Sequence, residues 1–129
     1  MRTINISTSS RSDMVDITSK VQKIIDHMEI DNGVVTVYVP HTTCAVTINE
    51  GADPSVQRDI MNELDKVIPW NDNYKHREGN SAAHIKTSLV GSSESIIVEN
   101  GNIQLGTWQK IFLCEYDGPR TRNVWIKKT

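Results

Sequence analysis

The alternation of polar and apolar residues predicts strands at both ends of the chain. Residues 2–8, "RTINIST", alternate at period two and predict an opening strand. Two runs rich in β-branched residues, 33–40 and 44–48, predict further strands on either side of the polar segment 40–43. His41 is therefore expected at a strand end.

Two segments carry apolar residues at helical spacing. In residues 16–33, Asp16 can cap the start of a helix and Gly33 can terminate it. Residues 53–69 begin with an Asp-Pro pair, which is typical of a helix N-terminus, and Pro69 closes the pattern. Both segments are predicted to form amphipathic helices.

A third, shorter helix is predicted in residues 80–91, with Asn80 as its cap and Gly91 as its stop. Beyond it, an Asn-Gly turn at 100–101 and an Asp-Gly-Pro turn at 117–119 separate apolar alternations, which predicts an antiparallel meander. Strands at both ends with helices inserted between them indicate an α+β fold, dominated by antiparallel sheet of sandwich or barrel type, with two to three helices.

Composition limits the domain organisation. The 129 residues suit one domain, residues 1–129, with a single core. Hydrophobic residues make up only 37% of the chain, so part of the apolar surface is expected to be buried between subunits.

Charge argues against two classes of partner. A formal net charge of -2 gives no global field that would favour nucleic acid or an anionic membrane. Neither an apolar run of about 20 residues nor a signal-peptide pattern is present, so we expect a cytoplasmic protein. Cys44 and Cys114 lie in apolar stretches, which indicates buried, reduced thiols rather than a disulfide.

Three of the four histidines are candidates for chemistry. His41, His76 and His84 lie in polar stretches near the ends of predicted elements, whereas His27 has charged neighbours and is expected on an exposed helix face. Three converging imidazoles would suit a zinc-type site with an open coordination position. The spacing itself is equally compatible with solvated loop histidines, which are common.

Acidic residues form a second group of candidates. Asp53 has a structural explanation as the cap of the second predicted helix. Glu50 stands beside Asn49 at a strand exit, where binding residues are often held. Glu78 can serve as an acid or base, although "HREGN" also fits an ordinary charged loop.

A local anion site is indicated by hydroxyl and guanidinium groups. Ser92 follows Gly91 after a helix end, and Arg120 and Arg122 follow a rigid turn. Guanidinium groups bind phosphate in a bidentate manner, so phosphate is the expected anion. The alternative is that both arginines protect a strand edge from pairing. Trp108 is expected in the core.

Three ordered motifs give the chain a family resemblance. They are "HTTCAVTINEGADPSV", "YKHREGNSAAHIKTSLVGSS" and "GTWQKIFLCEYDGPRTR". Together they resemble the YjbQ-like family, also described as secondary thiamine-phosphate synthase enzymes, over nearly the whole chain. Cys44 departs mildly from the small residue expected at its position and affects no proposed ligand.

The resemblance implies an α+β homotrimer with thiamine-phosphate synthase activity. This transferase reaction joins an aminopyrimidine diphosphate to a thiazole phosphate and releases pyrophosphate. The residues expected to take part in catalysis are His41, Glu50, Glu78 and His84. The residues expected to bind substrate or phosphate are Asn49, Asp53, Asn80, Ser92, Arg120 and Arg122. A divalent metal, zinc or magnesium, is expected on His41, His76 and His84, with no organic cofactor.

Two other functions remain open from the residues. A metal-dependent hydrolase would use a three-histidine ion to generate hydroxide, with a glutamate as base. A non-enzymatic trimer would bind a phosphorylated metabolite through the arginines and the Gly-Ser turn. In each case the partner is a small phosphorylated molecule, with no nucleic acid and no membrane.

Overall fold

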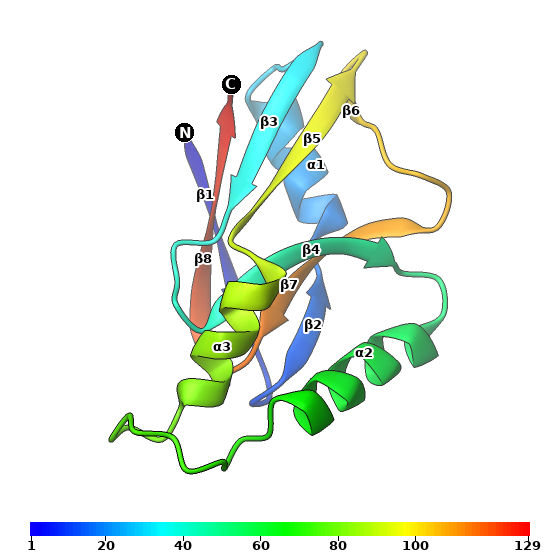
Figure 1. The fold of residues 1–129 in the computed structure, drawn as a ribbon. Helices are drawn as coiled ribbons and strands as arrows, with labels where there is room; N and C mark the ends of the chain where they lie inside the picture. The colour runs from blue at the N-terminus through cyan, green and yellow to red at the C-terminus, as the bar shows by residue number, and fades with distance from the viewer.

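The computed structural model describes residues 1–129 as an α+β domain of two antiparallel sheets and three helices (Figure 1). The fold class predicted from the sequence is therefore confirmed. The elements are β1 (Arg2–Ser7), β2 (Asp13–Asp16), α1 (Thr18–His27), β3 (Gly33–Tyr38), β4 (Cys44–Glu50), α2 (Pro54–Val67), α3 (Ser81–Val90), β5 (Ser93–Glu99), β6 (Asn102–Ile103), β7 (Gln109–Glu115) and β8 (Thr121–Lys128).

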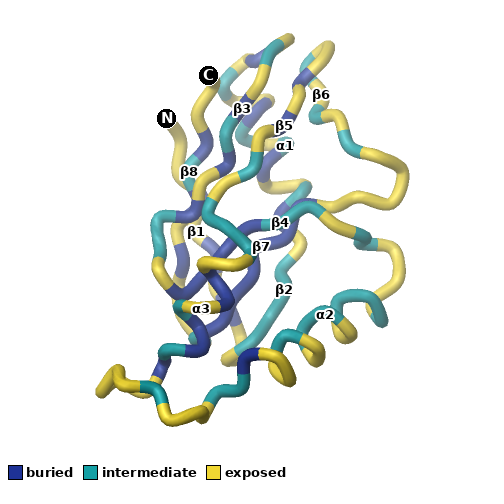
Figure 2. Tube along the Cα trace, in the orientation of Figure 1, coloured by how far each residue is buried: buried dark blue, intermediate teal, exposed yellow.

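The two sheets share one core. The larger sheet has the order β1-β8-β3-β5-β6, and the smaller has the order β2-β7-β4. The main core holds 17 buried residues from both sheets and α1, whose Val21 and Ile25 are fully buried. Figure 2 shows this burial along β4 and β7, whereas the segment that joins α2 to α3 is mostly exposed. None of the helices is long and apolar enough to cross a bilayer.

The predicted C-terminal meander is present only at its start, where the Asn-Gly turn at 100–101 joins the paired strands β5 and β6, and its continuation into β7 and β8 is wrong. Strands β7 and β8 follow each other in the chain but lie in different sheets, β7 between β2 and β4, and β8 between β1 and β3. The reason is visible in the burial of β7. Ile111 and Leu113 face the main core, while Phe112 and Cys114 face a second cluster, so this strand is covered on both sides. An apolar run of this kind indicates a central strand rather than a member of a half-exposed hairpin.

The three predicted helices are present, with differences at their ends. Asp16 Oδ1 accepts the Thr18 N–H at 2.9 Å, but the N-cap residue of α1 is Ile17 rather than Asp16. The helix ends at His27, before Glu29 with a φ of 54°, and not at Gly33. Asp53 caps α2 and Gly91 ends α3 with a φ of 105°. Strand β2 was not predicted, because its four residues contain only two apolar ones.

Three further predictions concern the burial of single side chains. Cys44 and Cys114 are free and buried, as expected, and burial raises the pKa of each thiol to about 12. His27 is exposed, also as expected. Trp108 is 64% exposed, so its predicted place in the core is wrong.

Candidate functional site

His41 lies in the loop that joins β3 of the larger sheet to β4 of the smaller one. The loop is held at Val39, whose N–H donates to the Ser92 carbonyl at 2.8 Å. The ring of His41 is fixed by the Asn123 N–H, which donates to Nε2 at 2.9 Å. Because Nε2 accepts this hydrogen bond, the neutral ring carries its proton on Nδ1.

The surroundings of His41 favour its uncharged form. Partial burial lowers the pKa of this imidazole below its ordinary value of 6.5, and the positive charge of Arg122 lowers it further, against an opposing effect of Glu115. With Nε2 engaged by the Asn123 N–H, the neutral ring presents its Nδ1–H as a hydrogen-bond donor of fixed orientation.

His41 and α3 enclose a polar hollow of about 320 Å³. We call it the histidine hollow, and its lining contains no hydrophobic residue. Its residues are His41, Thr42, His84, Thr87, Ser88, Gly91 and Ser92. Four of them recur at spacings of three and four along α3 and its C-terminal glycine, so they share one face of the helix. Two imidazoles and four hydroxyl groups therefore surround one small space.

Thr87 is the least satisfied residue of this lining. It is only 5% exposed, and its Oγ1 has no hydrogen-bond partner in the chain. Leaving a buried hydroxyl unpaired costs about 1–3 kcal/mol, so such groups normally have a partner. The position of Thr87 in the wall of the hollow makes a bound polar molecule a suitable partner.

A buried ion pair lies beneath the His41 loop. Glu115 is 0% exposed and Arg122 is 4% exposed. The Arg122 Nε donates to Glu115 Oε1 at 2.8 Å, and its Nη2 donates to Glu115 Oε2 and to Thr43 Oγ1. Thr8 Oγ1 completes the network by donating to Glu115 Oε1 at 2.7 Å.

The prediction that Arg122 is an exposed, phosphate-binding turn residue is therefore wrong. Its guanidinium group is engaged with Glu115 and Thr43 inside the protein. Arg120 does remain exposed at the turn, where its Nε donates to the Asp117 carbonyl at 2.8 Å. Only Arg120 of the two is accessible to a ligand in solution.

His84 lies between the other two candidate histidines. Its ring centroid is 5.6 Å from that of His76, and it shares the histidine hollow with His41. His76 is close to Glu78, with 3.8 Å between Nε2 and Oε2, and both side chains are largely exposed. No group of three His, Cys, Asp or Glu side chains is arranged to hold a metal ion. One chain therefore does not present the predicted three-histidine ligand set.

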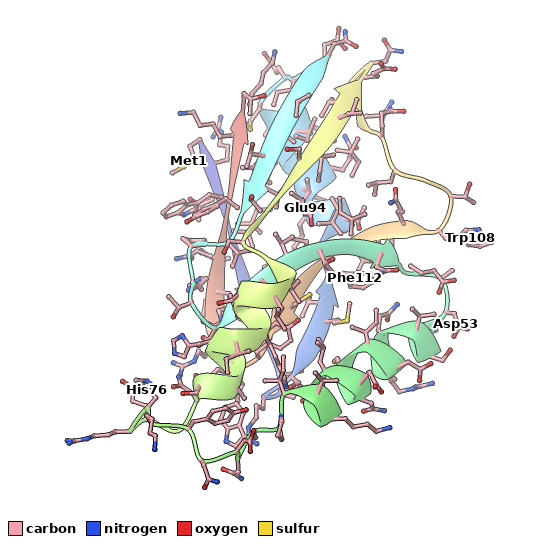
Figure 3. All side chains as sticks on the ribbon, in the orientation of Figure 1. Met1, Asp53, His76, Glu94, Trp108 and Phe112 are labelled. Atoms are coloured by element: carbon pink, nitrogen blue, oxygen red, sulfur yellow. The ribbon has the colours of Figure 1, made fainter.

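Asn49, Glu50 and Asp53 lie away from the histidine hollow. Asn49 and Glu50 form the far end of β4, a strand of seven residues that spans about 20 Å, and Asp53 follows it. Figure 3 shows Asp53 and His76 on opposite sides of the molecule. Within one subunit, Asn49, Glu50 and Asp53 therefore do not share a site with residues 73–93.

The residues of this distant group have local structural roles. Asp53 Oδ1 accepts hydrogen bonds from the Ser55 N–H at 2.9 Å and the Ser55 hydroxyl at 2.8 Å, which lowers the pKa of its carboxyl group. Asn49 Oδ1 accepts the Glu50 N–H at 2.7 Å. Glu50 Oε2 accepts the Asp53 N–H at 3.3 Å. Its role as the helix cap therefore explains the presence of Asp53 at this position without a bound ligand.

Asn80 joins the start of α3 to the arginine turn. Its Nδ2 donates to Asp117 Oδ2 at 3.0 Å, and the same carboxylate oxygen accepts from Arg120 Nη2 at 3.2 Å. Asn80 is the N-cap residue of α3, as predicted, but its side chain makes no capping hydrogen bond and its Oδ1 is buried without a partner. Asn80 therefore anchors the turn that presents Arg120.

Sequence reasoning missed several residues that shape the site. Thr87 and Ser88 carry a readable signal, because they stand three and four positions after His84 on a predicted helix. Glu115 carries no such signal. It ends an apolar run, and only the folded structure places it under Arg122.

Known proteins resemble this chain over its whole length. The family model described as UPF0047 protein YjbQ-like matches residues 2–129. UPF0047 protein YugU of Bacillus subtilis is 48% identical over 128 residues, which cover 98% of this chain and 97% of that protein. UPF0047 protein MJ1081 of Methanocaldococcus jannaschii is 52% identical over 122 residues, with 95% and 88% covered.

Solved structures agree with the fold. An uncharacterized conserved protein of the yjbq/upf0047 family from Clostridium acetobutylicum superposes with a TM-score of 0.97 at 50% identity, and all of both chains is covered. A conserved hypothetical protein from Thermus thermophilus superposes with a TM-score of 0.93 at 38% identity, also over both whole chains.

Proposed function

The chain belongs to the YjbQ-like UPF0047 family, and from this premise we propose that it is an enzyme acting on a small phosphorylated substrate in the histidine hollow. The observation that carries the proposal is the buried, unpaired Thr87 hydroxyl in a hollow that also contains His41 and His84. Hydroxyl and imidazole N–H groups are suitable donors to phosphate oxygens.

The proposed reaction is of the thiamine-phosphate synthase type, as the family resemblance implies. The thiazole nitrogen provides the electron pair of the new C–N bond to the pyrimidine methylene carbon. The C–O bond to the diphosphate breaks, and the leaving oxygen takes that electron pair. Hydrogen bonds to the leaving group stabilise its growing charge, and hydroxyl groups fixed on α3 are preorganised for this task.

The residues of the hollow take different parts in this proposal. Thr87 donates to the diphosphate oxygens from α3, and Ser92 donates from just beyond the helix, whereas the Ser88 hydroxyl already donates to the His84 carbonyl at 2.9 Å. His41 donates its Nδ1 proton, because the Asn123 N–H already occupies Nε2. Arg120 is the accessible cation of the nearby turn and is proposed to meet the second phosphate. Arg122 supports the His41 loop from inside and does not touch the substrate.

A direct assay tests the proposal. Purified protein is mixed with the aminopyrimidine diphosphate and the thiazole phosphate, and pyrophosphate release is followed. We expect turnover by the wild type and its loss in His41→Ala and His84→Ala. His27→Ala is the matched control, because this histidine is exposed on α1 and outside the hollow.

The other outcomes of this assay separate the alternatives. Phosphate binding without turnover of the two precursors would refute the synthase and favour a non-enzymatic binder. Equal turnover by wild type and His84→Ala would show that the reaction does not occur in the histidine hollow. The three-histidine hydrolase has no specific support, since one chain assembles no such ligand set.

A further inference from the structure

An aromatic pair stands beside the histidine hollow on the outer face of the larger sheet. Tyr38 of β3 and Trp125 of β8 are directly opposite each other in the strand register. Their rings stack with centroids 5.7 Å apart and an interplanar angle of 30°. Tyr38 is 41% exposed and Trp125 is half-buried, so the pair presents an aromatic surface to solvent.

A second hollow connects this pair to His41. We call it the aromatic hollow; it has a volume of about 480 Å³ and is lined by Tyr38, Pro40, His41, Thr42 and Trp125. His41 and Thr42 also line the histidine hollow. One short loop therefore forms a wall of both spaces, one aromatic and one rich in hydroxyl groups.

We infer that the aromatic hollow is the subsite for a planar heteroaromatic ring of the substrate, whose phosphoryl group lies in the histidine hollow. An aromatic face attracts a flat ring by offset stacking, and this attraction tolerates different heterocycles. A ring that carries its phosphoryl group on a short arm would place the arm beside His41, where the two hollows meet. The inference rests on the proposed function, because it assigns the second part of the same substrate.

The residues around the pair favour a small ring over an apolar protein surface. Pro40, His41 and Thr42 provide a rigid residue, an imidazole and a hydroxyl group within the same lining. On the opposite side, the aromatic pair is followed mainly by polar residues, among them Thr36, Lys127 and Lys128, and Met1 is the one further apolar side chain there. A heterocycle with exocyclic amino and ring nitrogen atoms finds hydrogen-bonding groups at the edge of such a subsite.

Two matched ligands test the assignment by calorimetry. The first is an aminopyrimidinylmethyl phosphate, and the second is glycerol phosphate, which has the phosphoryl group without the ring. We expect Trp125→Leu to weaken binding of the aromatic ligand by roughly 5- to 150-fold, the range of base stacking on an aromatic side chain, and to leave binding of glycerol phosphate unchanged. Trp108→Leu is the control, because this tryptophan is exposed and outside both hollows.

Fluorescence gives a readout of direct contact. In a Trp70→Phe, Trp108→Phe background, Trp125 is the single remaining tryptophan. The aromatic ligand is expected to quench its emission, whereas glycerol phosphate is not. Quenching that is equal for both ligands would contradict stacking on this ring.

The possible failures are distinguishable. If the wild type turns over its substrates and Trp125→Leu binds the aromatic ligand as tightly as the wild type, the aromatic subsite is refuted and the proposed function stands. If the wild type binds neither phosphate compound and turns over no precursor, both fail. If Trp125→Leu weakens binding of both ligands equally and lowers the particle mass measured by light scattering, the Tyr38–Trp125 pair belongs to a contact between subunits. In that case the aromatic subsite is refuted.

Discussion

Glu115→Gln tests whether the buried ion pair supports the His41 loop. The carboxylate accepts hydrogen bonds from Thr8, from Arg122, and from the N–H groups of Tyr116 and Asp117. A glutamine turns one oxygen into an NH₂ group that faces donors, and it leaves the charge of Arg122 buried and unpaired. Removing one partner of such a pair costs about 3–5 kcal/mol of unfolding free energy.

Urea unfolding at one fixed protein concentration measures this loss. Lys66→Ala is the matched control, because its pair with Glu63 is exposed at both ends and is worth no more than about 1 kcal/mol. The double variant Glu115→Gln, Arg122→Met removes the unpaired charge, so it is expected to recover part of the loss. A loss below about 1 kcal/mol in Glu115→Gln would refute the reasoning, since that is the range of exposed pairs.

The same carboxylate gives a pH dependence with a defined sign. Burial raises the pKa of Glu115, but hydrogen bonds from Arg122, Thr8 and the Asp117 N–H outweigh burial, so the pKa lies below its ordinary value of 4.5. In the unfolded chain Glu115 binds its proton more tightly. The wild type is therefore expected to lose stability as the pH falls below 4.5, and Glu115→Gln is expected to lose less over that range.

Three further predictions follow from single features. The pKa of His41 lies below 6.5, so folding stability and turnover are both expected to stay high at pH 6.5 and to fall at lower pH. Urea unfolding and a pH–rate profile measure the two trends, and a rate that rises on acidification would contradict a neutral His41. Arg120→Ala is expected to lower the affinity for phosphorylated ligands at least about tenfold in calorimetry. Because the side chain is exposed, little change in folding stability is expected. Light scattering is expected to give three times the subunit mass of 14.5 kDa, and a monomer at micromolar concentration would exclude the trimer.

Most elements of the fold could be predicted because their signals are local. Asp53 and Gly91 mark helix ends through their own backbone and side-chain geometry, and the period of two in β1 reflects its own alternation of buried and exposed residues. Strand partners are different. The sequence of β7 does not contain the information that β2 and β4 flank it, because that depends on which other segments cover its two faces.

The candidate site likewise combines residues that the sequence reveals with residues that it does not. His41 and His84 could be found because their residue type and their place at or beside an element end are visible in the sequence. The role of Arg122 could not. Its position after a turn predicted exposure, although its spacing of two from Val124 and Ile126 places it on the same buried face of β8; its partner Glu115 is known only from the fold. Residue type identified the candidates, and tertiary packing decides which of them face the histidine hollow.

The buried pair explains how this fold holds an imidazole in place on a loop. Thr8, Thr43 and the Glu115–Arg122 pair come from three regions that are far apart in the chain, and their hydrogen bonds join these regions at one point. Thr43 stands two residues from His41, and Asn123, which binds the His41 ring, stands next to Arg122. A functional side chain needs supporting contacts that fix its orientation to a fraction of an ångström. The loop carries the histidine, and the ion pair beneath it supplies the rigidity that the loop itself lacks.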